Sequence, residues 1–247
     1  MPKIDPSASC APDVAFGENV VVGAGVKLGA GVIIGNNVVL HPRTVIGKAV
    51  YIADNAVVGK APRLGATSTL KPDDNLPNLV IDENCSIGTG AVVFAGSSIG
   101  PGATIGDQAV VRERCRISER ALIGCRVVVE NDVMIGAGTK IQTGAYITAY
   151  VTIEDDVFIA PMVTTTNDNA MGRGAGRFEN KKGARIKSGA RIGAAAVLLP
   201  AVTIGREAFV AAGAIVTRDV PDGRLVMGAP ARIVRDVPKD EWLEVSK

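Results

Sequence analysis

An aliphatic residue returns at every sixth position along most of this chain. The repeat runs without a slip through stretches of eight, fourteen and six positions, from Phe16 to Val58, from Ile81 to Ile159 and from Ile186 to Val216. A second, smaller residue lies two positions before most of these aliphatics, and side chains two apart on a strand point the same way. Each hexad therefore predicts a short strand with two inward side chains, followed by a turn. A six-residue period is typical of a parallel β-helix.

The composition fits a narrow, repeated core. The chain has 29 glycines among 247 residues, a proportion well above the roughly 7% of average proteins, and only 4% aromatic residues. Glycine follows the inward aliphatic in many hexads, where we expect it to allow the unusual backbone dihedrals of a turn. Cys85 and Cys115 fall at small inward positions, so we expect both in the core.

Over roughly residues 14–220 the pattern resembles the hexapeptide-repeat family, whose motif is [LIV]-G-x-x-[STAV]-x. The resemblance implies an all-β fold, a left-handed parallel β-helix with three hexads per coil and hence about nine coils here. It also implies a homotrimer of parallel prisms with sites at the subunit interfaces. Most members are acyltransferases that use acyl-CoA or acyl carrier protein.

Two segments break the register and divide the chain into its expected parts. We predict a β-helix acyltransferase domain over residues 1–237, with loop insertions at about 60–79 and 167–184, because both segments are rich in Gly, Pro, Asp and Asn. Residues 238–247 begin with proline and acidic residues and predict a short C-terminal helix. Long loops on a rigid scaffold often carry binding function.

Charge and histidine content exclude several classes. The net charge is +2 and no run of like charge reaches five residues, which gives no support to nucleic acid or membrane partners. The N-terminus lacks the apolar core of a signal peptide, so we expect a cytoplasmic protein. A single histidine cannot form a multi-histidine metal centre, and we predict no metal site.

Positions eighteen apart should stack on one corner of the prism, and one such column is unusually polar. After the first insertion it runs Phe94, Arg112, Glu130 and Thr148 without a glycine. We predict that this corner is the acceptor site, with Glu130 catalytic and the other three binding substrate. The single histidine, His41, falls four coils below Glu130, about 19 Å away. An amine needs less help from a base than a hydroxyl does, so this placement favours acylation of an amine.

Three further stretches, Lys140–Gly144, Val151–Pro161 and Thr166–Arg173, resemble the nucleotide-sugar N-acetyltransferases of this family. The resemblance implies that the Thr-Asn-Asp-Asn segment borders the amino sugar, with Asn167 and Asp168 as catalytic candidates and Asn169 as a sugar contact. Gln142 and Arg173 become candidates for substrate binding. A turn carboxylate outside these stretches, Asp107, is a further candidate acid.

The C-terminal stretches Val210–Pro221 and Val226–Arg232 resemble the closing signature of the same family. Small side chains there would let the backbone approach the pantetheine arm, and arginine pairs well with phosphate. The resemblance assigns six residues to CoA: Ala194, Ala212, Gly213, Arg218, Gly228 and Arg232.

These observations predict an acyl-CoA-dependent N-acyltransferase, most simply an N-acetyltransferase, that acts on a nucleotide-linked amino-deoxysugar. Two alternatives stay open at this point. One is an O-acyltransferase of a sugar or an acyl carrier protein-dependent enzyme, and the other is a non-catalytic β-helix used as an assembly module.

Overall fold

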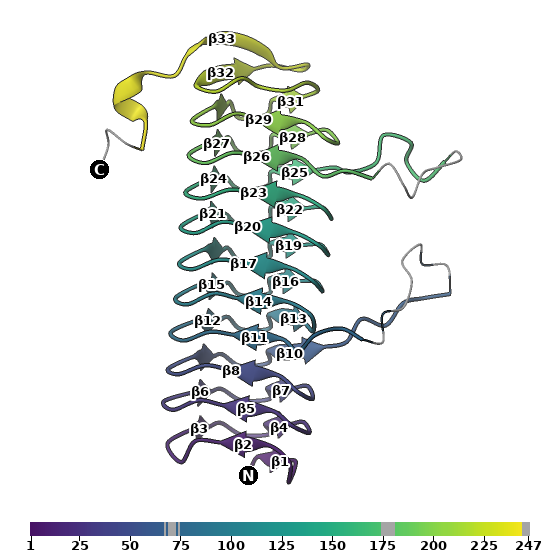
Figure 1. Cartoon of the computed structure of the whole chain (residues 1–247), viewed down its shortest axis with the longest axis vertical. Coiled ribbons are helices and arrows are strands. Elements are labelled where there is room, and N and C mark those ends of the chain that lie inside the picture. The colour runs from purple at the N-terminus through teal and green to yellow at the C-terminus, as the bar shows by residue number, and fades with distance from the viewer. Residues whose placement is uncertain (67, 69–72, 74, 174–180, 244–247) are drawn as a thin grey trace.

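The computed structural model shows one long prism of stacked coils (Figure 1). It describes residues 1–66, 68, 73, 75–173 and 181–243. Each coil contributes one short strand to each of three sheets, which contain 11, 10 and 12 strands. Strands eighteen residues apart pair in parallel, as Val92 with Val110 and Val110 with Val128. The parallel β-helix predicted from the six-residue period is confirmed, whereas its left-handed sense stays a prediction.

Sheet A, the 11-stranded sheet, faces outward with a row of valines. Its strands are β1 (Lys3–Ile4), β4 (Val21–Val22), β7 (Val39–Leu40), β10 (Val57–Lys60), β13 (Val92–Phe94), β16 (Val110–Val111), β19 (Val128–Val129), β22 (Tyr146–Ile147), β25 (Thr164–Thr165), β28 (Val197–Leu198) and β31 (Ile215–Val216).

Sheet B has ten strands and more polar outward positions. They are β2 (Ser9–Cys10), β5 (Lys27–Leu28), β8 (Val45–Ile46), β11 (Val80–Ile81), β14 (Ser98–Ile99), β17 (Arg116–Ile117), β20 (Met134–Ile135), β23 (Thr152–Ile153), β26 (Arg185–Ile186) and β29 (Thr203–Ile204). A bridge between Ile204 and Val220 continues this sheet by one step.

Sheet C ends in the only antiparallel pair among the described residues, which joins its last two strands. The strands are β3 (Ala15–Phe16), β6 (Ile33–Ile34), β9 (Tyr51–Ile52), β12 (Ser86–Ile87), β15 (Thr104–Ile105), β18 (Leu122–Ile123), β21 (Lys140–Ile141), β24 (Phe158–Ile159), β27 (Arg191–Ile192), β30 (Phe209–Val210), β32 (Arg224–Met227) and β33 (Arg232–Asp236).

The prism has eleven to twelve turns, so the expected nine coils were too few. The repeat extends below Phe16 through Ile4 and Cys10, and the second stretch continues through Thr165. Cys10 and Thr165 occupy the inward position without being aliphatic, so a search for branched residues passes over them. The Thr165 hydroxyl is buried and accepts a hydrogen bond from the Thr148 N–H at 2.8 Å, which satisfies it inside the apolar core.

The glycines that directly follow the inward aliphatic act, except for Gly59 (φ 84), by close approach rather than by unusual dihedrals. A Cβ on Gly106 would lie 2.8 Å from the backbone nitrogen of Cys125 in the next coil. In most turns the left-handed conformation comes two residues later, where Gly31 (φ 70), Asn37 (φ 56) and Arg43 (φ 64) all occur. Among the described motif glycines, the expected positive φ is found at Gly59 alone; at the others the spacing between coils excludes a side chain.

The C-terminus differs from the predicted helix over 238–247. Its only helical part among the described residues is one 3₁₀ turn, η1 (Lys239–Glu241), and residues 244–247 lie outside the description. The hairpin of β32 and β33 was not foreseen. After it, the chain returns along the outside of the last coils, where Glu241 pairs with Arg191 at 2.8 Å (Figure 1).

Candidate functional site

Both long connections leave the prism at the same edge, the A–B corner, where the chain passes from sheet A to sheet B. One follows β10 and the other follows β25, and both project to the same side in Figure 1. The predicted loop boundaries include residues 67, 69–72, 74 and 174–180, which lie outside the described residues. Five coils separate the two exits, a distance of about 24 Å at the usual strand spacing.

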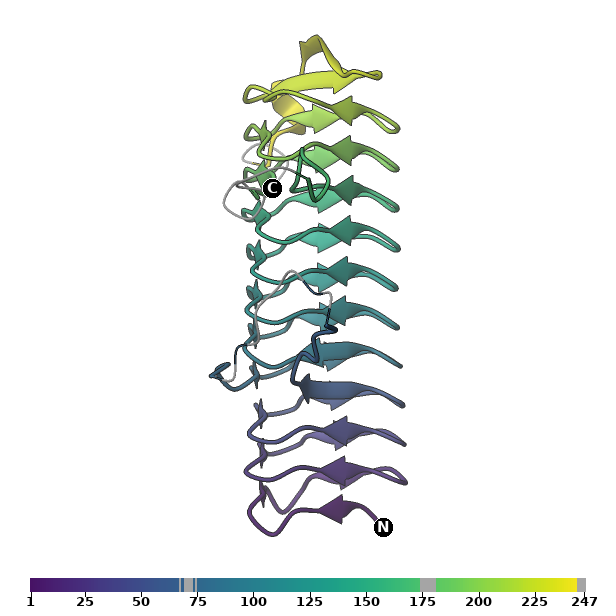
Figure 2. The same ribbon diagram turned by 90° about the vertical axis from the view of Figure 1, so that its right-hand side faces the viewer.

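The polar column predicted from the sequence follows this edge. Phe94, Arg112, Glu130 and Thr148 each end or follow a strand of sheet A, and the parallel register puts them on successive coils. Figure 2 shows the coils stacked evenly, so neighbouring members of the column are separated by about 4.8 Å. The phasing of the repeat thus positioned these side chains correctly.

A hollow of ≈ 220 Å³, which we call the upper pocket, opens below the second connection. It is lined by Glu130, Asn131, Tyr146, Thr148, Ala149, Tyr150, Asn167 and Lys181. Two hydrogen bonds hold Asn167 there. Its side-chain N–H donates to the backbone carbonyl of Ala149 at 3.3 Å, and its backbone carbonyl accepts from the Lys182 N–H at 3.1 Å. The upper pocket therefore combines one carboxylate and the ammonium of Lys181 with hydroxyl, phenol and carboxamide groups.

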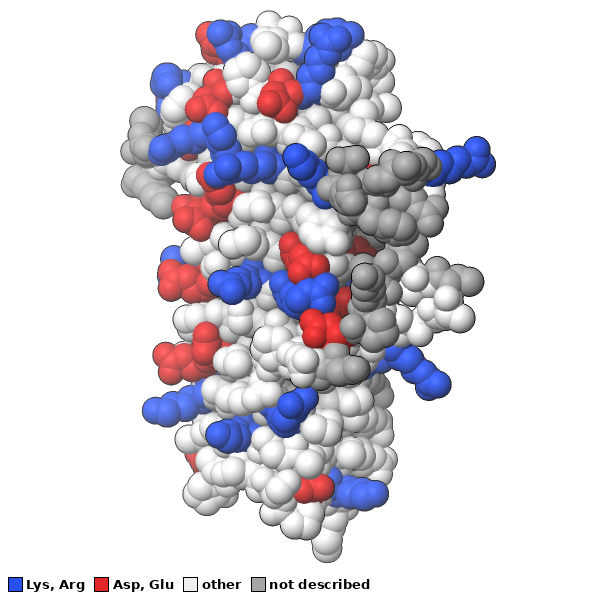
Figure 3. Space-filling view, turned by 45° about the vertical axis from the view of Figure 1, so that its right-hand side comes forward, with Lys and Arg blue, Asp and Glu red and all other residues white. Residues whose placement is uncertain are grey.

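Arg112 fixes the carboxylate of Glu130. Its Nε and Nη2 donate to the two carboxylate oxygens of Glu113, both at 2.9 Å, and its Nη1 donates to Glu130 at 3.2 Å. The Glu113 side chain is only 2% exposed, so its carboxylate is shielded from water, whereas Arg112 is 21% exposed. Burial alone would lower the pKa of Arg112, but the hydrogen bonds and charges of the two glutamates keep it above its ordinary value. Basic and acidic side chains alternate over the middle of this face in Figure 3.

Tyr146 remains a neutral phenol at physiological pH. Burial raises the pKa of its hydroxyl above the ordinary value of 10.0, and the nearby charge of Glu130 raises it further. A protonated phenol beside an ionised carboxylate can donate a hydrogen bond to a developing negative charge.

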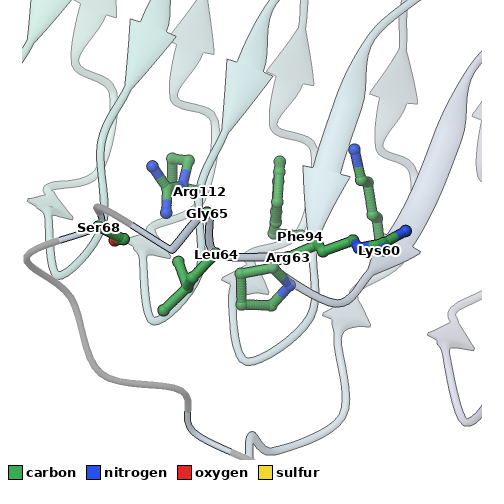
Figure 4. Close-up of a pocket in the computed structure, with 8 residues that line it drawn as sticks. Lys60, Arg63, Leu64, Gly65, Ser68, Phe94 and Arg112 are labelled. Atoms are coloured by element: carbon green, nitrogen blue, oxygen red, sulfur yellow. The ribbon is translucent and has the colours of Figure 1, made fainter.

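A second hollow of ≈ 260 Å³, the lower pocket, lies beneath the first connection (Figure 4). It is lined by Lys60, Pro62, Arg63, Leu64, Gly65, Ser68, Phe94 and Arg112. The Lys60 Nζ lies 5.4 Å from the centre of the Phe94 ring, and the Arg112 Cζ lies 5.5 Å from the same centre. Both contacts are within cation–π range.

The Thr-Asn-Asp-Asn segment does not enter the upper pocket as a unit. Asn167 lines it, whereas Asp168 is partly exposed and Asn169 and Arg173 are exposed on the second connection. The Asp168 carboxylate accepts from the N–H groups of Ala170 and Gly172 at 2.7 and 2.9 Å. Its hydrogen bonds, first from Gly172 and then from Ala170, lower its pKa, so this carboxylate is a weak base that shapes the loop.

Asp107 and Gln142 lie at a different edge, the C–A corner, because both follow strands of sheet C. The Asp107 carboxylate accepts from the Thr89 N–H at 2.8 Å, a contact between turns of adjacent coils. Within one chain the structure does not bring either residue to the upper pocket.

The six residues expected at CoA separate into two groups. Arg218 and Arg232 line one hollow of ≈ 330 Å³ at the C-terminal end of the prism, together with Val216, Val226 and Ile233. Ala194, Ala212 and Gly213 stack at the C–A corner, where the Gly213 N–H donates to the Ala194 carbonyl at 2.8 Å. Gly228 follows β32, and its carbonyl accepts from the Ile215 N–H at 3.0 Å.

Sequence reasoning missed Asn131, Tyr146, Lys60 and Arg63. Asn131 and Tyr146 neighbour the predicted column residues, and the two basic residues begin the first insertion, so a search of the whole corner would have found them. His41 lies at the same corner, four coils below Glu130. Burial, and then the charge of Lys60, lower its pKa.

The described part of the chain contains no cluster of three His, Cys, Asp or Glu side chains that could hold a metal ion. In the same residues, no helix has the length and apolar character needed to cross a membrane.

Two family models match the chain. The model for bacterial transferase hexapeptide (six repeats) matches residues 25–60, and the model for the hexapeptide repeat of succinyl-transferase matches residues 184–218. Both matched segments lie within the hexad-built parallel β-helix. Over these two segments the chain is similar to hexapeptide-repeat acyltransferases.

Similar proteins match over limited stretches. The bifunctional protein GlmU of Rubrobacter xylanophilus is 47% identical over 53 residues, which are 22% of this chain and 11% of that protein. A 2,3,4,5-tetrahydropyridine-2,6-dicarboxylate N-acetyltransferase of Staphylococcus aureus is 52% identical over 50 residues, 20% of this chain and 21% of that protein. The structure of a Francisella novicida UDP-N-acetylglucosamine acyltransferase is 19% identical with a TM-score of 0.49, covering 95% of this chain and 68% of that one.

Proposed function

We propose that this protein transfers an acyl group, most simply acetyl, from acyl-CoA to the amino group of a nucleotide-linked amino-deoxysugar. The observation that carries the proposal is the upper pocket, in which Glu130, Tyr146, Thr148 and Asn167 meet. The single imidazole of the chain, that of His41, lies about 19 Å away along the prism. The site therefore has groups that suit an amine and lacks the imidazole base that would suit a hydroxyl.

In this reaction the amine nitrogen attacks the carbonyl carbon of the thioester and the carbon–sulfur bond breaks. The thiolate leaves with the bonding electrons, and a proton from the nitrogen neutralises it. A neutral amine is already nucleophilic, so the protein has mainly to orient it and to stabilise its developing positive charge.

Glu130 is suited to that task because Arg112 holds its carboxylate in place. The carboxylate accepts a hydrogen bond from the amine, while Asn167 fixes a neighbouring hydroxyl or the amine itself. The neutral phenol of Tyr146 is the available donor for the carbonyl oxygen, which gains negative charge during attack.

Acyl-CoA fits the hollow at the C-terminal end. Arg218 and Arg232 supply guanidinium groups for its phosphates, and Val216, Val226 and Ile233 supply apolar walls. When bound, the thioester supplies the activated acyl group. The name of the Staphylococcus relative, an N-acetyltransferase, supports an amine as the acceptor.

A homotrimer with sites at subunit interfaces belongs to the same proposal. Valine holds the outward position on most strands of sheet A, which ends at the A–B corner. Burying this row against a second copy would remove apolar surface from water and put the upper pocket at the rim of the interface. Light scattering should give three times the chain mass of 25.4 kDa.

The direct test measures thiol release from acetyl-CoA with UDP- and dTDP-linked amino sugars, beside their hydroxyl counterparts. Release with an amine and none with the matching hydroxyl is the expected result. Release with the hydroxyl alone would instead assign an O-acyltransferase, and no release with any acceptor would favour the assembly module.

Glu130→Gln should lower kcat by roughly 100-fold, because the amide lacks the charge that stabilises the amine. Glu119→Gln is the matched control, since Glu119 is an exposed turn glutamate that pairs only with its neighbour Arg120 among described residues. Circular dichroism should show both variants folded. Equal activity of the two variants would remove Glu130 from the mechanism.

A further inference from the structure

The lower pocket has a composition that acyl transfer alone does not explain. Pro62, Leu64 and Phe94 form apolar walls, and Lys60 and Arg63 bring two positive charges to the same hollow. Figure 4 shows Lys60, Arg63 and Leu64 along the first connection, beside Phe94 at the end of β13.

The cationic side chains of the lower pocket differ in whether a carboxylate pairs with them. The guanidinium of Arg112 is occupied by Glu113 and Glu130. Lys60 and Arg63 are exposed and have no carboxylate partner within 4.0 Å in the described part of the chain. Two cations with no carboxylate partner among the described residues, beside an apolar wall, favour an amphiphilic anion as ligand.

The ring of Phe94 contacts the cationic groups of Lys60 and Arg112, so it is not free to stack on a base. Lys60 and Arg112 approach its ring from opposite sides, as Figure 4 shows. A flat ligand would have to displace one of them. The apolar wall that a base or ribose can contact is therefore formed by the half-buried side chains of Pro62 and Leu64.

The two pockets are contiguous through Arg112. This side chain lines the lower pocket and donates to Glu130, which lines the upper pocket. Phe94 and Glu130 are two coils apart, about 10 Å. A sugar attached to a phosphate in the lower pocket would extend along the corner towards Glu130.

We propose that the lower pocket binds the nucleoside diphosphate of the acceptor. Lys60 and Arg63 pair with the diphosphate oxygens, and Pro62 and Leu64 pack against the nucleoside. This inference rests on the proposed function, because the lower pocket would bind the nucleotide part of that reaction's acceptor, at a distance from the amine. Arginine presents a planar fork that matches phosphate, and lysine adds a compact point charge.

Calorimetric binding of UDP and dTDP to the full chain tests the pocket without any acyl transfer. The double variant Lys60→Ala/Arg63→Ala should bind either nucleotide about 100-fold more weakly, or roughly tenfold for each cation removed. Lys48→Ala is the control, because Lys48 is an exposed lysine at the opposite, B–C, corner. It should bind as the unaltered protein does.

Binding of uridine, thymidine and inorganic pyrophosphate separates the nucleoside and diphosphate contributions to the affinity. Pyrophosphate should lose affinity in the double variant, and both nucleosides should not. Unchanged UDP and dTDP affinity in the double variant would overturn the assignment, as would the absence of nucleotide binding to the unaltered protein. Pyrophosphate binding as tight as that of UDP would overturn the nucleoside contact.

Acylation kinetics distinguish failure of this site from failure of the proposed function. The double variant should raise KM for a nucleotide amino sugar and leave kcat unchanged. Thiol release that persists with unchanged KM would retain the N-acyltransferase and reject the pocket. Nucleotide binding that is lost in the variant, without release from any amine in the unaltered protein, would retain the pocket and reject the reaction.

Discussion

At the scale of residues, the close spacing of adjacent coils limits the size of the side chains in this prism. Inward positions take Ile, Val, Ala and Cys because the triangular interior is narrow, and the motif glycines leave room for adjacent backbone. Cys115 is an example: it is fully buried, and burial raises the pKa of its thiol from 9.0 to about 12. Burial also raises the pKa of Cys85.

We predict that a thiol reagent at pH 8 labels Cys125, which is exposed, well before Cys85 and Cys115, which are buried. Reactivity requires the thiolate, and buried thiols with raised pKa values supply almost none. Counting labelled thiols in the native and urea-unfolded protein checks this order. Fast native labelling of Cys115 would contradict its position in the core.

The same thiol predicts a pH dependence of stability. Between about pH 9 and pH 12 the folded state holds a proton at Cys115 that the unfolded state releases, so stability falls as pH rises through this window. Below pH 9 the contribution is complete. Urea midpoints at pH 8 and pH 10.5 should therefore differ less in Cys115→Ala than in the unaltered protein.

At the scale of elements, every strand is two to five residues long and gains its stability from neighbours. The two residues of β21 illustrate the alternation, because Ile141 points inward and is 0% exposed while Lys140 points outward. Parallel pairing on both sides fixes this register. A shift by one residue would turn the aliphatic row into solvent.

Ile141→Ala should lower the free energy of unfolding by about 2–5 kcal/mol, because it leaves a cavity in a core without room to relax. Lys140→Ala, its neighbour, should change it by less than about 0.5 kcal/mol. Urea unfolding monitored by circular dichroism compares the two. Similar losses in both variants would show that the strand is not held as described.

The six-residue repeat predicted the strands from the sequence, whereas it predicted only some of the residues of the candidate site. Phase alone put Phe94, Arg112, Glu130 and Thr148 on one edge, because a solenoid converts a spacing of eighteen into a contact. Asp107 and Gln142 fell on another edge, since their assignment did not use the phase. The lower pocket and the terminal hairpin depend on how non-repetitive segments fold back, and no period encodes that.

At the scale of the whole molecule, three sheets run the length of the prism and must be closed at the C-terminal end. The antiparallel strand β33 covers the edge of sheet C, which would otherwise offer unpaired backbone groups to another chain. The final segment then fastens to the last coils through the Arg191–Glu241 pair.

A chain truncated after Asp222, which lacks β32 and β33, should associate end to end as its concentration rises. A chain truncated after Val237 keeps the hairpin and serves as the control. Light scattering over a concentration series should show growth only for the shorter chain. Equal behaviour of the two chains would show that the hairpin does not protect the edge.

The common exit of the two long connections has a consequence for substrate size. Their separation is a whole number of coils, so it can change only in steps of about 4.8 Å for each eighteen residues added or removed. The number of coils along the corner therefore sets the distance between the two connections. Insertion of one coil between Arg112 and Glu130 would keep the lining residues of both pockets but separate Arg112 from Glu130, and it would select acceptors that are longer by about that step.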